Sequence, residues 1–166
     1  MNERVILVDQ SDRLAGEAEK LEVHRQGRLH RAFSVFVLDA LGRVLLQRRA
    51  AGKYHSGRLW SNTCCGHPRP GEDIRAAAER RLAEEMGFQC PLEPAGAFIY
   101  RAALGDLVEH EYDHVFRGRF DGDPRPDPAE VEAWQWMPLE ALEAGLAARP
   151  GDYTVWLPEA VKRLRG

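Results

Sequence analysis

One cationic and two anionic side chains stand close together in a segment rich in helix-forming residues. Arg81 and Glu85 are four residues apart, so they share one face of a helix, and Glu84 lies beside them. Carboxylate oxygens suit Mg²⁺, and a guanidinium group pairs with phosphate oxygens through two donors. These residues therefore fit a site that holds magnesium and phosphate together. The alternative is an exposed helix with ion pairs along its surface, which is what charge runs usually indicate.

The spacing in front of this helix favours the binding site. Gly66 is followed after five residues by Glu72, and after seven more by residues 80–88, RRLAEEMGF. This spacing resembles the Nudix box, a loop and helix that binds a divalent metal and a diphosphate, and it is more specific than an isolated glycine-rich loop. Arg81 stands where the Nudix pattern has glutamate, and the other fixed positions match. The resemblance implies a Nudix-like α+β fold, a mixed β-sheet flanked by helices.

A cysteine-containing segment directly before the box indicates a chemistry other than hydrolysis. Residues 61–68, SNTCCGHP, resemble a segment of the type I isopentenyl diphosphate isomerases, a family with the Nudix fold. Residues 28–34, RLHRAFS, resemble another segment of that family, and so do Glu109, Glu111 and Trp156, in the same order along residues 3–160. The resemblance implies an enzyme that isomerises isopentenyl diphosphate to dimethylallyl diphosphate.

A Nudix-type diphosphate hydrolase is the main alternative. Glu72, Glu84 and Glu85 favour that function, because hydrolases of this kind use box carboxylates. Arg81 and Cys65 speak against it, as does the cluster of histidines described next. A metal- or diphosphate-binding module without catalytic activity is a more distant alternative.

The isomerase resemblance implies a metal site built from imidazole and carboxylate groups. Its ligands would be His24, His30, His67, Glu109 and Glu111. Glu109 and Glu111 alternate along a predicted strand, so both side chains point to the same face. Imidazoles together with carboxylates suit Zn²⁺ or Mn²⁺ better than Mg²⁺, which prefers oxygen ligands. A histidine taken by itself is more often an ordinary surface or core residue.

The same resemblance implies a small-molecule diphosphate substrate held by Mg²⁺ and by cationic side chains. Glu85 would bind the Mg²⁺ together with the diphosphate. The cationic positions that match the family are Lys20, Arg49, Lys53 and Arg81. Lysine supplies a point charge and arginine a bidentate fork. Each of these cations taken alone could also be an exposed charge that only aids solubility.

Moving a double bond from C3–C4 to C2–C3 requires a proton delivered to C4 and another removed from C2. We expect Glu111 to be the acid and Cys65 to exchange the C2 proton, with a thiol pKa lowered by nearby cations and metal. Trp156 and Tyr100 would stabilise a cation-like state with their aromatic faces. Packing roles are the alternative for Cys65 and Tyr100, and we assign Cys64 and Cys90 to packing.

The elements that must position these residues alternate between strands and helices. We predict strands at residues 5–8, 32–38, 44–48, 96–103, 107–116 and 131–137, and helices at 73–86, 138–146 and 153–164. The most secure helix begins after Asp73, a plausible N-cap, and ends at Gly87. Residues 50–62 and 121–130, rich in glycine, proline and charge, are predicted loops.

Composition places the chain among ordinary globular proteins. Its 166 residues fit one domain, 1–166, with 44% hydrophobic and 30% charged residues. A net charge of −3 gives no general case for binding nucleic acid, and no apolar run is long enough to cross a membrane. The N-terminal residues lack the pattern of a secretory signal, and three cysteines do not form a disulfide framework. We therefore expect a cytoplasmic monomer or weak homo-oligomer.

Overall fold

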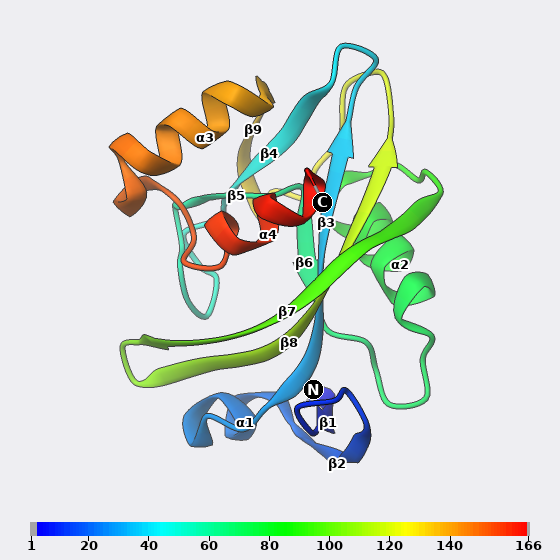
Figure 1. Ribbon diagram of the computed structural model, residues 1–166, viewed down its shortest axis with the longest axis vertical. Coiled ribbons are helices and arrows are strands. Elements are labelled where there is room, and N and C mark those ends of the chain that lie inside the picture. Colours follow the sequence, from blue (N-terminus) through cyan, green and yellow to red (C-terminus); the bar gives the residue numbers. More distant parts are fainter. Residues whose placement is uncertain (1–2, 166) are drawn as a thin grey trace.

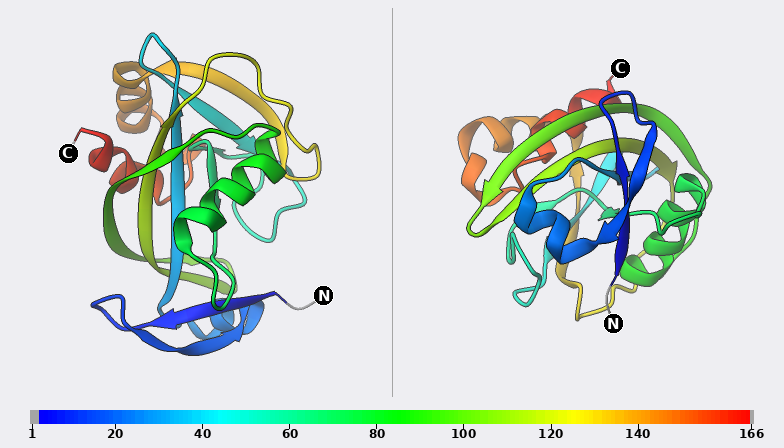
Figure 2. Two further views of the ribbon diagram at one scale, coloured as in Figure 1. Left: turned by 90° about the vertical axis from the view of Figure 1, so that its right-hand side faces the viewer. Right: turned by 90° about the horizontal axis from the view of Figure 1, so that it is seen from below.

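The structure is a computed structural model that describes residues 3–165, and it consists of one mixed sheet with helices on both sides (Figure 1). The strands are β1 (Arg4–Val8), β2 (Leu14–Glu19), β3 (His30–Leu38), β4 (Arg43–Arg49), β5 (Trp60–Ser61), β6 (Cys64–Gly66), β7 (Leu92–Leu104), β8 (Leu107–Arg119) and β9 (Val131–Pro138). The helices are α1 (Lys20–Gln26), α2 (Ile74–Met86), α3 (Leu139–Ala148) and α4 (Leu157–Leu164), with a 3₁₀ turn at Pro150–Asp152. Helix α2 lies on one side of the sheet, and α3 and α4 lie on the other (Figure 2). The predicted α+β architecture is confirmed.

Strand β3 is the centre of the sheet. Along one edge it pairs in parallel with β8, so that His30 lies opposite Glu111. Along its other edge it pairs antiparallel with β6, where Ser34 lies opposite Cys65, and it contacts β1 and β4 near its two ends. The two strands that carry the predicted acid and the predicted thiol therefore flank the same central strand.

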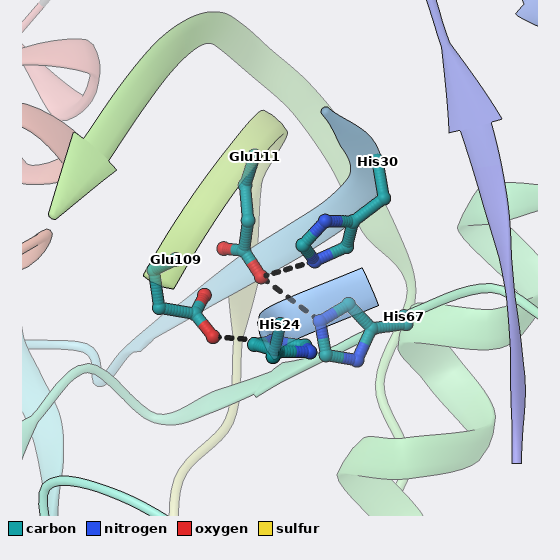
Figure 3. A group of neighbouring side chains, drawn as sticks. All are labelled: His24, His30, His67, Glu109 and Glu111. Carbon is teal, nitrogen blue, oxygen red and sulfur yellow. Dashed lines mark hydrogen bonds and ion pairs between the residues drawn. The ribbon is translucent and has the colours of Figure 1, made fainter. Parts of the chain in front are cut away.

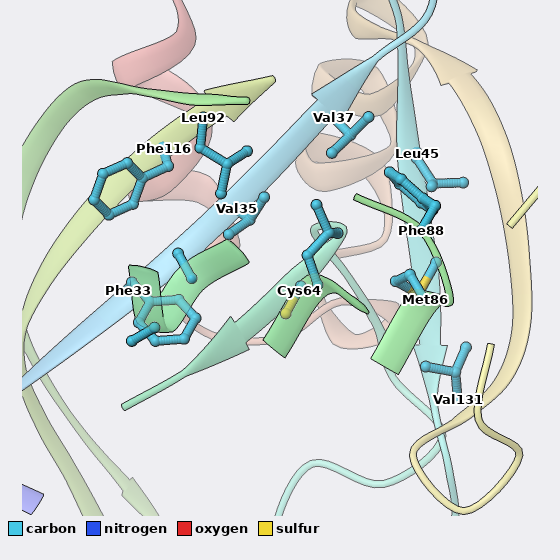
Figure 4. Close-up of a cluster of buried hydrophobic side chains, with 13 residues drawn as sticks. Phe33, Val35, Val37, Leu45, Cys64, Met86, Phe88, Leu92, Phe116 and Val131 are labelled. Atoms are coloured by element: carbon cyan, nitrogen blue, oxygen red, sulfur yellow. The ribbon is translucent and has the colours of Figure 1, made fainter. Parts of the chain in front are cut away.

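The two faces of β3 have different surroundings because side chains alternate along a strand. One face carries Phe33, Val35 and Val37, which pack with Leu82 and Met86 of α2 in an apolar core (Figure 4). The other face packs Phe36 against α4 in a second apolar cluster. Toward the start of β3 this second face becomes polar, with His30 and Ser34 both buried. The predicted site residues gather at this polar end.

Helix α2 begins and ends where the sequence predicts. The Asp73 carboxylate accepts the backbone N–H of Ala76 at 3.0 Å and so caps the first turn. Gly87 ends the helix in the left-handed region, with φ 74°, and a Cβ there would lie 2.2 Å from the carbonyl oxygen of Arg125. Only glycine fits this position, so the residue both ends the helix and permits the following loop to pack closely.

Several short elements were not predicted. Strands β2 and β6 and helix α1 are among them, and β5 lies inside the predicted loop at residues 50–62. The last helix begins at Leu157 instead of residue 153, because a 3₁₀ turn and the extended Tyr153 precede it. In the described part of the chain, no helix has both the length and the apolar character needed to cross a bilayer. The expected single domain of 1–166 includes Met1, Asn2 and Gly166, which lie outside the described residues, and it stays a prediction.

Candidate active site

A cavity of about 150 Å³ opens at the polar end of β3. Most of the predicted site residues line it: Lys20, Arg49, Lys53, Cys65, His67, Arg81, Glu85, Tyr100, Glu109, Glu111 and Trp156. The two other predicted residues, His24 and His30, are fully buried beside the carboxylates of its wall. The structure therefore brings together every residue that the isomerase resemblance assigned to the site, whereas Glu84, which the charge pattern of the helix had added, does not line the cavity.

The predicted metal ligands form one compact group (Figure 3). One donor atom from each of the five residues lies within 4.8 Å of all the others. His24 Nε2 lies 2.5 Å from Glu109 Oε1, while the Nε2 atoms of His30 and His67 lie 3.3 Å and 2.9 Å from Glu111 Oε2. These residues come from α1, β3, β8 and the segment after β6, so the tertiary fold alone assembles them.

Backbone carbonyls orient two of the imidazole rings. His24 Nδ1 lies 2.7 Å from the carbonyl oxygen of Lys20, and His30 Nδ1 lies 3.0 Å from that of Arg28. A carbonyl only accepts, so each Nδ1 carries a hydrogen, and in the neutral ring Nε2 then has the lone pair that can bind a metal ion. Within residues 3–165 neither Nε2 makes a well-oriented hydrogen bond, although each lies beside a carboxylate. Such rings, fixed at one nitrogen and free at the other, are typical of metal ligands.

Two buried carboxyl groups need a cation beside them. Glu109 and Glu111 are 2% and 6% exposed. Burial, followed by the charge of Glu109, raises the pKa of Glu111 to about 7. The Tyr100 hydroxyl oxygen lies 2.5 Å from Glu111 Oε1 and 3.1 Å from Glu109 Oε2, and its single hydrogen is donated to the nearer oxygen, that of Glu111. The donor set of three imidazoles and two carboxylates fits a divalent metal ion.

A second group of charges surrounds the end of α2. Arg81 contacts the Glu85 carboxylate directly, and its Nη2 lies 3.5 Å from Oε1 of Glu130. Lys53 also pairs with Glu130, from the loop between β4 and β5. Gly66, at the end of β6, allows the chain that leads into α2 to pack closely against β3, since a Cβ at that position would lie 2.8 Å from the ring of Phe33. Lys53, Arg81 and Glu85 all line the cavity.

Arg49 and Lys20 are two further cations that line the cavity. The Arg49 guanidinium lies over the Trp156 ring, with Cζ 5.5 Å from the ring centroid, and its buried Nε has no hydrogen-bond partner among the described residues. Lys20 Nζ lies 4.4 Å from the centre of the Tyr54 ring and 2.8 Å from Glu3 Oε2. Four cationic side chains thus line a cavity that has room for an anion.

The Cys65 thiol lines the cavity, and its environment corrects one expectation. Burial, followed by the charge of Asp113, raises the pKa of Cys65 to about 12, and Arg49 opposes this rise. The sequence analysis expected a lowered pKa, which is wrong for the protein alone because the thiol is desolvated. Cys64 is fully buried in the apolar core, and Cys90 packs against it, as predicted.

Some residues at the site were not predicted. His55 Nε2 lies 2.9 Å from Glu109 Oε1, and the carboxylate of Glu130 holds Lys53. Tyr54 packs edge-on against His24, with ring centroids 5.3 Å apart. Tyr54 and His55 directly follow Lys53 in the sequence. Because Lys53 was already a predicted site residue, its position was a signal that these two neighbours also reach the site. For Glu130, nothing in the sequence distinguishes it from the other charges of its loop.

Two of the three box carboxylates of the hydrolase alternative, those of Glu72 and Glu84, lie outside the cavity, whereas Glu85 lines it. Glu72 pairs with Arg80 through two hydrogen bonds of 2.8 and 3.0 Å, and Glu84 pairs with the same arginine at 2.7 Å. Neither glutamate lines the cavity. Their carboxylates therefore stabilise the outer face of α2.

Comparison with known proteins agrees with this geometry. The NUDIX domain model matches residues 28–157. The chain is 55% identical to the isopentenyl-diphosphate Delta-isomerase of Burkholderia multivorans, over 98% of this chain and 93% of that protein. It is 52% identical to the enzyme of the same name from Nocardia farcinica, over 95% and 92% of the two chains.

Among solved structures, a Deinococcus radiodurans protein superposes with a TM-score of 0.81, at 22% identity and over 97% of this chain and 98% of that one. At this level of identity the superposition supports the fold only. The family model and the two relatives, by contrast, span most of the chain. The chain therefore belongs to the isopentenyl-diphosphate Delta-isomerase family of NUDIX-domain proteins.

Proposed function

We propose that this protein converts isopentenyl diphosphate to dimethylallyl diphosphate. One observation carries the proposal: Cys65 and Glu111, on strands that flank opposite edges of β3, line the same cavity. A double-bond shift needs one group to deliver a proton and a second group to remove one, and these two side chains can do so at one substrate. Proteins named for this reaction are 55% and 52% identical to this chain over 98% and 95% of its length, which supports the same activity.

In the forward direction the Glu111 carboxyl delivers its proton to C4 of the substrate. The C3–C4 double bond is consumed, a cation-like state forms at C3, and the thiolate form of Cys65 removes a proton from C2, which yields the thiol and the C2–C3 double bond. One proton enters and one leaves, so the reaction is balanced. In the reverse direction the Cys65 thiol and the Glu111 carboxylate are the starting pair. In the metal-free protein the raised pKa of Glu111, about 7, means that its carboxyl can hold a proton near neutral pH.

We propose that His24, His30, His67, Glu109 and Glu111 hold Mn²⁺ or Zn²⁺. When bound, this ion withdraws charge from the Glu111 carboxyl and makes it a stronger acid. Tyr100 orients the same carboxyl by donating to Oε1. The donor set, with two buried imidazole nitrogens turned toward the carboxylates, supports the assignment.

The diphosphate of the substrate would bind beside Glu85 and the cationic side chains of the cavity. Glu85 would hold Mg²⁺ together with this diphosphate, and Lys20, Arg49, Lys53 and Arg81 would supply the cationic contacts. In the free protein Lys53 and Arg81 share the Glu130 carboxylate. The diphosphate replaces this carboxylate, so both cations are already gathered before the substrate arrives.

The carbon skeleton then lies between the two proton-transfer groups. Trp156 is only 3% exposed and presents its ring at the cavity wall, 6.4 Å from the Tyr100 ring between centroids. Aromatic faces stabilise a neighbouring cation by about 2 kcal/mol or more when water is excluded. The enclosed wall also keeps water from capturing the cation.

The test is isomerisation in D₂O with Mg²⁺ and added Mn²⁺ or Zn²⁺. We expect dimethylallyl diphosphate to form with deuterium incorporated, and Cys65→Ala and Glu111→Gln each to abolish turnover while the fold persists. Cys90→Ala, a change at a cysteine outside the cavity, serves as the matched control and keeps the rate. Unchanged turnover in either active-site variant refutes this mechanism. Phosphate release from a nucleotide panel would instead indicate the hydrolase. The cytoplasmic location and the monomeric or weakly oligomeric state stay predictions.

A further inference from the structure

The side chain of Asn62 lies between the thiol and the indole ring that line one wall of the cavity. Its Oδ1 accepts the S–H of Cys65, with a sulfur–oxygen distance of 3.2 Å, and the indole N–H of Trp156 at 3.1 Å. We propose that Asn62 is a positioning residue that orients Cys65 and Trp156 toward the substrate through this single oxygen. The inference rests on the proposed isomerase function, in which both of those residues contact the substrate.

The partners of the Asn62 amide fix its orientation. Its Nδ2 donates to two backbone carbonyl oxygens, that of Val35 at 3.1 Å and that of Cys64 at 2.8 Å. Carbonyls only accept and an indole N–H only donates. Exchanging oxygen and nitrogen would set the amide nitrogen against the indole N–H and the oxygen against two carbonyls. The carbonyl oxygen of Asn62 must therefore face Cys65 and Trp156.

This requirement also explains why the residue is an amide. An aspartate would keep the acceptor but would place a second oxygen against the two backbone carbonyls. A leucine of similar size would leave the indole N–H without its Asn62 partner and remove one hydrogen bond from each carbonyl, and a buried polar group left unpaired costs about 1–3 kcal/mol. Asn62 has no exposed surface, so water does not replace these bonds.

Hydrogen bonds of residues 60 and 61 also hold the segment that carries Trp156 beside Asn62. The Ser61 hydroxyl donates to Asn62 Oδ1 at 2.9 Å and lies 3.0 Å from the Thr154 hydroxyl. The backbone N–H of Thr154 donates to the carbonyl oxygen of Trp60 at 2.9 Å. The loop before α4 is therefore held against residues 60–62, and the indole ring and the thiol keep a fixed relative position.

The direction of the thiol hydrogen follows from these contacts. Asn62 Oδ1 is 3.2 Å from the sulfur, whereas the next neighbour, Ser34 Oγ, is 3.8 Å away and itself donates to Asp113 at 2.8 Å. While Cys65 is a thiol, this contact therefore holds its sulfur in one position at the cavity wall. An error of about 1 Å in the position of a reacting group can cost on the order of 10²-fold in rate.

Vibrational spectroscopy tests the contact without any need for activity. The S–H stretching band of Cys65 is isolated as the infrared difference between the unchanged protein and its Cys65→Ser variant. We expect the band at a lower frequency than that of a thiol without a hydrogen bond, and we expect Asn62→Leu to move it upward. A band at the frequency of a free thiol in the unchanged protein overturns the proposal, whether or not the variant folds.

Kinetics test the consequence. Asn62→Ala and Asn62→Leu should lower kcat by on the order of 10²-fold and leave KM unchanged, because the diphosphate-binding cations are not touched. Thr63→Val is the matched control: Thr63 is equally buried, and its hydroxyl bonds only to the backbone of Val37 and Leu45.

The control should lose stability yet keep both kcat and the S–H band. An equal loss of kcat in Thr63→Val would show that Asn62 acts only through the fold and would overturn the proposal. A protein without isomerase activity would refute the proposed function, and the S–H band would still report on the Asn62 contact.

Discussion

Replacing one buried imidazole should remove most of the stabilisation that a metal ion gives this protein. His30 is fully buried, its Nδ1 is fixed by the carbonyl of Arg28, and its Nε2 faces the carboxylate of Glu111. His30→Asn removes this donor while keeping a polar side chain. Residues that merely orient a metal ligand are worth 10- to 100-fold in metal affinity, so a ligand itself should be worth roughly 100-fold or more.

The expected change in melting temperature follows from mass action. At a metal concentration of about 100 times its Kd, binding stabilises the unchanged protein by about 2.7 kcal/mol. A variant that binds roughly 100-fold more weakly gains only about 0.4 kcal/mol at the same concentration. For a chain of this size, about 1 kcal/mol corresponds to a Tm change of about 2–4 °C. The metal should therefore raise the Tm of the unchanged protein by about 5–11 °C and that of His30→Asn by about 1–2 °C.

The assay is a thermal melt of metal-free protein with and without Mn²⁺ or Zn²⁺, after a titration that gives the Kd of the unchanged protein. His114→Asn is the matched control, because His114 lies on the same sheet but pairs with Asp12 outside the cluster. It should show the full shift. A full shift in His30→Asn would exclude His30 as a ligand, and the absence of a shift in the unchanged protein would refute the metal site.

Three further changes test other parts of the structure. Lys53→Met should raise KM for isopentenyl diphosphate roughly tenfold or more with little change in kcat, since a charge-assisted hydrogen bond contributes about 1.5–3 kcal/mol. Steady-state kinetics measures both constants, and a fall in kcat with KM unchanged would contradict this role of Lys53. Leu82→Ala removes a fully buried side chain of α2 and should cost about 2–5 kcal/mol of unfolding free energy with kcat retained below the Tm, as denaturant titration would measure. Glu84→Gln should leave deuterium incorporation unchanged, because this glutamate lies outside the cavity, where it pairs with Arg80 at 2.7 Å and with Arg81 at 3.3 Å while Arg81 keeps its contact with Glu85; a large loss would revive a role for the box carboxylates.

Local signals in the sequence were enough to predict the longer elements. Helix α2 has its cap and its stop within the chain segment itself, at Asp73 and Gly87, and strands β3 and β8 are long apolar or alternating runs. Helix α1 has only seven residues, so its periodicity is not visible, and a helix this short is stable only through tertiary contacts. Here the contacts come from the buried Val23 and His24.

The site could be predicted as a set of residues but not as a network. His55 contacts Glu109, and Asn62 contacts Trp156, across 54 and 94 residues of sequence, and no spacing rule links residues so far apart. The thiol pKa was predicted in the wrong direction because the sequence shows which charges are near Cys65 but not that the sulfur is buried. Desolvation depends on the complete fold, so the sign of such a shift follows only from the structure.

The register of β3 with its two neighbours is what makes the chemistry possible. In that register Glu111 lies opposite His30 and Cys65 lies opposite Ser34, so all four side chains share one face of the sheet. The intervening residues, among them Phe33 and Val35, point to the opposite face and pack under α2. Because the side-chain period of a strand is two, a slip by one residue would exchange the faces. It would bury carboxylates against the apolar core and move the thiol away from the cavity. The hydrophobic packing of α2 thus enforces the same register that brings Glu111 and Cys65 to one cavity.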